Sequence, residues 1–241
     1  MSVGNNGVNF TSRCPKIRRA QWVCHKVKSE FPHLSSTKIT PSIDRLEDKF
    51  PQAADKFMYY NPQAGRFISF DSPQEKRVIS ILHWFRMFIR DLNAQRMFRA
   101  ANNTDFGSMY AIISQLKFAK VGNCFENAKL SELILKLNGI DNACIGKIKV
   151  GEHPIDHVVC LFNKDGSDFT GNVNKNTIIV DSWLGDADFA DNMLGKYRSI
   201  YKDYLFVPKD GKLSIERIEK LNLNEAEYQE FKDDFPQLLK K

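Results

Sequence analysis

The hydrophobic pattern of this chain changes its period near residue 138, and that change limits the fold more than any other feature. Before it, residues 124–137 place apolar side chains at helical spacing, and an Asn-Gly pair at 138–139 provides a stop for that helix. After it, three short apolar runs separated by polar connections are typical of strands, at 143–150, 157–162 and 177–180. Helices followed by strands that short hairpins can join predict an α+β fold with an antiparallel sheet.

The segment before residue 120 is predicted to be mainly helical. Helices are expected at 22–31, 41–57, 73–101 and 108–118. The helix at 73–101 has the strongest signal, because a Ser-Pro start with Glu75 resembles a capping box and a broad apolar stripe follows it, which we expect to lie in the core. A further strand at 204–207 and a terminal helix over 224–241 are also expected.

We expect residues 1–20 to form a flexible N-terminus and residues 21–241 to form a single domain. Within it, 21–106 would be a helical part and 107–241 the core. Apolar residues make up 42% of the chain and aromatic residues 12%, which excludes a disordered protein. No run approaches the ~20 apolar residues of a membrane span, and the N-terminus has no apolar signal-peptide region. We therefore expect a soluble protein.

The five cysteines are an odd number and include no CxxC pair. A secreted domain held by disulfides usually shows an even, regularly spaced set. We therefore expect free thiols and synthesis in a reducing, cytoplasmic compartment.

The formal net charge is +6 and the pI is about 9.0. A basic cluster at 16–19 and the arginines of 73–101 give a second interpretation, a non-catalytic module that binds protein or nucleic acid. However, the aromatic residues lie in apolar stripes, and no nucleic-acid-binding motif accompanies them. Nucleic acid is therefore a disfavoured partner.

Cys124 occupies the first turn of the predicted helix 124–137, directly after Gly122 and Asn123. The unpaired amides and the positive dipole end of a helix start stabilise a thiolate. The same amides can bind the oxyanion that forms when a carbonyl carbon is attacked. Cys144 and Cys160 lie inside apolar strands and are expected to be ordinary buried thiols. Cys124 is therefore the candidate nucleophile.

His157 begins one predicted strand and Asp181 directly follows the next. In an antiparallel hairpin the start of one strand lies beside the end of the other, so these two side chains are expected to be neighbours. Together with Cys124 they would form a set of nucleophile, base and orienting residue. Trp183, two residues beyond Asp181, is expected to shield the His–Asp pair from water.

Three segments carry a resemblance to a known superfamily: Gly-Asn-Cys-Phe-Glu-Asn-Ala at 122–128, Asp-His-Val-Val at 156–159 and Ile-Val-Asp-Ser-Trp at 179–183. They resemble the nucleophile, histidine and third-residue segments of papain-like and transglutaminase-like thiol enzymes. This implies a cofactor-free cysteine protease, glutamine deamidase or transglutaminase that works through a thioester. The chain also resembles compact bacterial effectors, which implies a host protein as substrate, selected by the part before residue 107, and translocation without a cleavable signal peptide.

The chain departs from the family pattern at two places. Ser182 stands where a proline is usual after the aspartate. Gln115 lies nine positions before Cys124, farther than the oxyanion glutamine of papain-like peptidases. Gln115 and Asn123 are therefore alternatives for the side chain that completes the oxyanion hole.

A zinc site is a further alternative, because zinc accepts both cysteine and histidine ligands. Cys124, His153 and His157 would supply them. Pro154 lies between the two histidines in a predicted turn that enters a strand, so the pair does not share a helix face. The metal site is therefore disfavoured.

Overall fold

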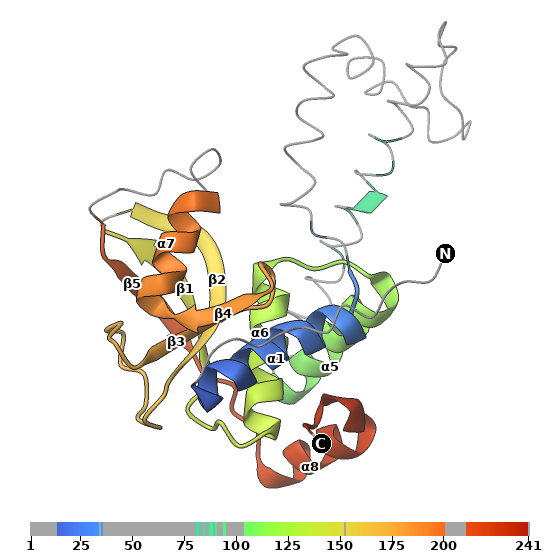
Figure 1. The fold of residues 1–241 in the computed structure, drawn as a ribbon. Coiled ribbons are helices and arrows are strands. Elements are labelled where there is room, and N and C mark those ends of the chain that lie inside the picture. Colours follow the sequence, from blue (N-terminus) through green and yellow to red (C-terminus); the bar gives the residue numbers. More distant parts are fainter. Residues whose placement is uncertain are drawn as a thin grey trace, which may run out of the picture.

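The computed structural model describes residues 14–33, 35, 81, 84, 87, 88, 90, 94, 104–151, 153–200 and 211–240. These residues form helices packed on an antiparallel sheet (Figure 1), which confirms the α+β class. The predicted helix at 41–57, the predicted strand at 204–207 and residues 1–13 lie outside the described residues.

The sheet has five strands in the order β4-β3-β2-β1-β5, and every neighbouring pair is antiparallel. The strands are β1 (Cys144–Val150), β2 (His153–Asn163), β3 (Thr177–Asp181), β4 (Asp186–Phe189) and β5 (Leu213–Glu219). β1, β2 and β3 are the three strands predicted from the sequence. β4 and β5 were not predicted. β4 is short and acidic, and in β5 a charged pair at 216–217 interrupts the alternation of apolar and polar residues.

In the sequence, helices precede the strands, interrupt them once and follow them. They are α1 (Pro15–Glu30), α5 (Asp105–Ser114), the π-helical turn η1 (Gln115–Ala119), α6 (Cys124–Leu137), α7 (Ala190–Ile200), α8 (Glu225–Asp234) and the 3₁₀ turn η2 (Pro236–Leu238). The bounds of α6 are those predicted. The expectation of a flexible segment up to residue 20 is wrong for its last part, because α1 begins at Pro15 and buries Ile17 and Ala20 against the core.

The two faces of the sheet carry separate apolar clusters. Cys160 and Phe162 of β2 belong to the cluster with α1, α5 and α6, whereas Val159 and Leu161 belong to the cluster with α7. This alternation is the one that the period of the strand predicts. The sheet is therefore covered on both sides, with α6 and α1 on one face and α7 on the other.

The predicted helix at 73–101 is described at six residues only, and all six are helical. Phe88 is buried, but Trp84 stacks on it at 5.8 Å between ring centroids and remains 44% exposed. Trp84 is therefore not a core residue, contrary to the expectation from the broad apolar stripe. Among the described residues, no helix is long and apolar enough to cross a membrane.

Candidate active site

Cys124 lies at the first position of α6, and Asn123 is the N-cap. The backbone amide of Asn123 donates to Glu126 Oε2 at 2.8 Å, which is one half of a capping box, and Asn127 N donates to Asn123 O at 3.2 Å. These bonds fix the backbone on both sides of the thiol. Cys124 is partly exposed, in contrast to the buried Cys24, Cys144 and Cys160.

The loop before Cys124 packs tightly against η1. Gln115 Nε2 donates to the carbonyl of Val121 at 3.0 Å, and both residues are buried. A Cβ atom on Gly122 would lie 2.5 Å from Leu116 Cδ2, so only glycine allows this close approach. Gln115 therefore holds the loop that carries the nucleophile, and one bond of its amide group is engaged there.

The structure brings His157 and Asp181 together as the predicted hairpin requires. His157 Nε2 lies 2.6 Å from Asp181 Oδ2, and the two residues are 3% and 1% exposed. The register pairs Cys160 with Val180, and one further step places Val159 opposite Asp181. His157 is two residues from Val159 on the same face, so it meets Asp181 diagonally across the hairpin.

The thiol of Cys124 forms a side-chain hydrogen bond with His157. Because Nε2 of the ring faces Asp181, Nδ1 is the nitrogen that the geometry assigns to the thiol. Burial by itself lowers the pKa of His157, but the charge and hydrogen bond of Asp181, helped by Cys124, outweigh burial and raise the pKa above its ordinary value of 6.5. The imidazole is therefore favoured in its protonated form at neutral pH.

Asp181 is held as a carboxylate by three donors. Burial raises its pKa, but His157 and the other donors overcome this effect, and the pKa is lowered from 3.8. Leu184 N donates to Oδ1 at 2.9 Å and the Tyr197 hydroxyl donates to Oδ2 at 3.0 Å. Tyr197 was not predicted from the sequence. The sequence feature that could have identified it is the helical spacing of Ala190, Met193, Leu194 and Tyr197, which is typical of a buried helix face.

Two aromatic rings cover the His157 ring. The centroid of Trp183 lies 5.2 Å from it and that of the buried Tyr197 lies 5.7 Å from it. Trp183 thus lies where the sequence places a shield for the His–Asp pair. Removing water from this pair strengthens the electrostatic interaction between the imidazole and the carboxylate.

The indole of Trp183 also joins a bridge to the nucleophile helix. Trp183 Nε1 donates to Ser35 Oγ at 2.8 Å, and Ser35 Oγ donates to Asn123 Oδ1 at 2.8 Å. The side chains of Trp183 and Asn123, from opposite halves of the site, therefore meet at one hydroxyl group. Nothing in the sequence distinguishes Ser35 from the other serines.

Ser182, which departs from the family pattern, has a partner that a proline would lack. Its hydroxyl lies 2.7 Å from Ser131 Oγ, and Ser131 Oγ donates to the carbonyl of Asn127 at 2.8 Å. All three residues are buried. Ser182 therefore links the end of β3 to the first turns of α6.

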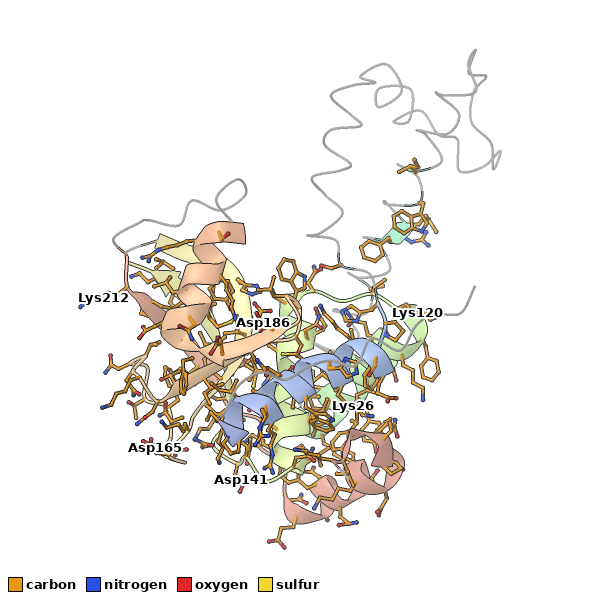
Figure 2. The ribbon with its side chains drawn as sticks, viewed as in Figure 1. Lys26, Lys120, Asp141, Asp165, Asp186 and Lys212 are labelled. Atoms are coloured by element: carbon orange, nitrogen blue, oxygen red, sulfur yellow. The ribbon has the colours of Figure 1, made fainter. Side chains whose placement is uncertain are left out.

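The turn after Asp181 rests on α1, which lies along β4. Side chains spaced along α1 donate to three backbone carbonyls there: Lys28 to Leu184, Cys24 to Asp186 and Gln21 to Ala187. Figure 2 shows Asp186 where the sheet meets α1. The N-terminal helix therefore supports the strand connection that carries Trp183.

Within the described ranges, no group of three or more His, Cys, Asp or Glu side chains is arranged to hold a metal ion. His153 is the first residue of β2, so it does not share a helix with His157. No family model, curated protein or solved structure matches this chain. The site itself, in which a thiol, an imidazole and a carboxylate interact in that order, is what indicates a function.

Proposed function

We propose that the chain is a thiol-dependent acyl-transfer enzyme that acts on amide groups of a protein substrate. Cys124 is its nucleophile, His157 its base and Asp181 the residue that orients the base. The observation that carries the proposal is one buried imidazole whose Nε2 lies 2.6 Å from a carboxylate and which also bonds to a thiol at a helix start. A papain-like or transglutaminase-like core is the architecture that this arrangement fits.

The reaction has two steps that balance without a cofactor. In the resting pair the Cys124 proton is already on Nδ1 of His157, and the thiolate sulfur forms a bond to the carbonyl carbon, whose oxygen becomes an oxyanion. The oxyanion collapses, the carbon–nitrogen bond breaks, and His157 returns its proton to the leaving amine or ammonia. Water or a second amine then gives a proton to His157 and attacks the thioester, which releases the thiolate. Water makes the enzyme a hydrolase and an amine makes it a transamidase.

The oxyanion is assigned to the backbone amide of Cys124 and the side-chain amide of Asn123. Helix-start amides have no acceptor within the helix, and they point toward an incoming anion. The single donor of Trp183 is engaged by Ser35, and Gln115 is directed to the Val121 carbonyl. Of the two side chains that the sequence proposes for this role, Gln115 and Asn123, we therefore assign Asn123 to it.

The test is the rate at which iodoacetamide labels each cysteine at about pH 6.5, followed by mass spectrometry. A thiol paired with an imidazolium reacts at a pH where ordinary thiols react slowly. Cys14 is also partly exposed and serves as an internal reference. We expect Cys124 to react at least about ten times faster than Cys14, and we expect this preference to disappear in His157→Ala.

The control variant is His25→Ala, which changes an exposed histidine on α1. It should keep the preference of the wild type. Equal labelling of Cys124 and Cys14 in the wild type would rule out the activated pair. If the pair is present, incubation with a peptide library separates the reactions, because deamidation adds about one mass unit to glutamine and proteolysis divides the peptide.

A further inference from the structure

The side chain of Ser35 bonds to both halves of the candidate site. It lies beyond the end of α1 and is 7% exposed. On one side it contacts Trp183, in the turn that follows Asp181, and on the other it contacts Asn123, the N-cap of the nucleophile helix. Its hydroxyl thus sits between the shield of the base and the residue before Cys124.

The chemistry of the three groups fixes the direction of both bonds. An indole N–H can only donate, so Ser35 Oγ accepts from Trp183. The proton of a buried hydroxyl needs an acceptor, and Asn123 Oδ1 provides it at 2.8 Å. Once Oδ1 is held on the Ser35 side, the Nδ2 donor end of the Asn123 amide is directed away from Ser35.

The segment that carries Ser35 is attached to α6 at a second point. His33 Nδ1 lies 2.6 Å from the carbonyl of Phe31, which can only accept, so Nδ1 carries the proton. His33 Nε2 then accepts from Asn127 Nδ2 at 2.9 Å. Asn127 is one helical turn beyond Asn123, so His33 and Ser35 bond to successive turns at the start of α6.

We propose that Ser35 is a positioning residue that orients the Asn123 amide so that its Nδ2 group donates to the oxyanion. This inference rests on the proposed function and deepens it. The bonds of Ser35 to Trp183 and Asn123 let it act through the amide of Asn123. It acts on the step in which negative charge forms on oxygen and has no part in forming the thiolate.

Two probes separate these steps. Iodoacetamide alkylates Cys124 by displacement at carbon and forms no oxyanion, whereas p-nitrophenyl acetate acylates it through an oxyanion and releases p-nitrophenol. In Ser35→Ala we expect the burst of p-nitrophenol to slow by about tenfold or more, because a misoriented donor loses part of the ~10²–10³-fold effect of an oxyanion donor. The rate of Cys124 alkylation should stay within about twofold of the wild type, because that reaction does not use this donor.

Asn123→Ser provides the second arm, since serine keeps the N-cap role but lacks the amide. Its burst should slow at least as much as that of Ser35→Ala, and the double variant should be no slower than Asn123→Ser alone, because both changes affect one donor. Ser29→Ala is the matched control, since Ser29 is an exposed serine on α1 whose hydroxyl donates to the Lys26 carbonyl, and both rates should be unchanged.

Each possible result either supports or contradicts the positioning role of Ser35. The inference is overturned if Ser35→Ala slows both probes in parallel, which a general structural role would cause, if it slows neither, or if the two substitutions act additively. The proposed function is tested by the wild type alone. If its burst equals that of Cys124→Ala and Cys124 labels no faster than Cys14, the proposed function fails and this inference falls with it.

Discussion

His157 is a buried imidazole whose charge depends on Asp181. Because its folded-state pKa is raised, it contributes stability that is fully present below about 6.5 and is lost as the pH rises through the raised value. Asp181 has a lowered pKa, so its contribution is present above 3.8 and is lost as the pH falls through the folded-state value. The free energy of unfolding of the wild type should therefore fall between about pH 6.5 and pH 9.

Asp181→Asn should remove most of this fall. Without the carboxylate, burial lowers the pKa of His157, and the ring is neutral across the whole interval. Urea unfolding of both proteins at the two pH values measures the difference. Asp188→Asn is the matched control, because Asp188 pairs with Lys196 rather than with a histidine, and this variant should keep the fall. An equal fall in Asp181→Asn and the wild type would contradict the prediction.

Tyr197 of α7 stabilises the same carboxylate. Tyr197→Phe keeps the ring that covers His157 but removes the hydroxyl bonded to Asp181. A hydrogen bond to a charged group contributes about 1.5–3 kcal/mol, so urea unfolding should show a loss of this size. Tyr110 provides the comparison, since its hydroxyl donates to Asp234 at the exposed surface. If Tyr110→Phe is as destabilising as Tyr197→Phe, burial does not strengthen the Tyr197 bond.

At the scale of elements, local signals predicted α6 best, because its cap, its apolar period and its Asn-Gly stop all lie within the helix and its flanks. Helix α5 is capped earlier than expected, by Thr104, whose Oγ accepts from Gly107 N at 3.1 Å. The predicted helix 108–118 then continues into the π-helical turn η1. The position at which this helix ends depends on how η1 packs against the Cys124 loop. The periodicity of apolar residues does not predict that contact.

The close approach of η1 to the Cys124 loop gives a paired glycine test. Gly122→Ala would place Cβ 2.5 Å from the buried Leu116 side chain and should lower the free energy of unfolding by about 1–3 kcal/mol. A Cβ atom added to Gly195, inside α7, would meet nothing within 4 Å, so Gly195→Ala should stabilise by about 0.4–1 kcal/mol. Thermal unfolding measures both variants. Equal effects would show that η1 moves away from the loop without penalty.

At the scale of the whole molecule, the contacts that could be predicted from the sequence are those that a single hairpin determines. His157 and Asp181 are joined by two adjacent strands, so alternation and register were sufficient to bring them together. Ser35 meets Asn123 across 88 positions of the chain, and no local pattern specifies how α1 and its following residues dock. Gln115 shows the same limit, because its amide binds the Val121 carbonyl from the π-helical turn η1, which the sequence does not predict.

This long-range docking makes α1 part of the unit that forms the site, which the buried cysteines can report. Cys24 lies in α1, while Cys144 and Cys160 lie in β1 and β2. Burial raises the pKa of Cys24 and of Cys144 to about 12, so none of these thiols should be alkylated until the fold opens. In pulsed alkylation across a urea series, we expect Cys24 and Cys160 to become reactive at the same midpoint.

The fast labelling of Cys124 at about pH 6.5 should be lost at that midpoint too, because it depends on His157 and on a helix start that His33 and Ser35 hold. Labelling of Cys24 at a lower urea concentration than Cys160 would show that α1 opens separately. In that case the behaviour of Cys124 decides what α1 contributes. If its fast labelling persists after Cys24 is exposed, the thiol and imidazole are held by α6 and the sheet alone, whereas a joint loss makes the N-terminal helix a component of the active site.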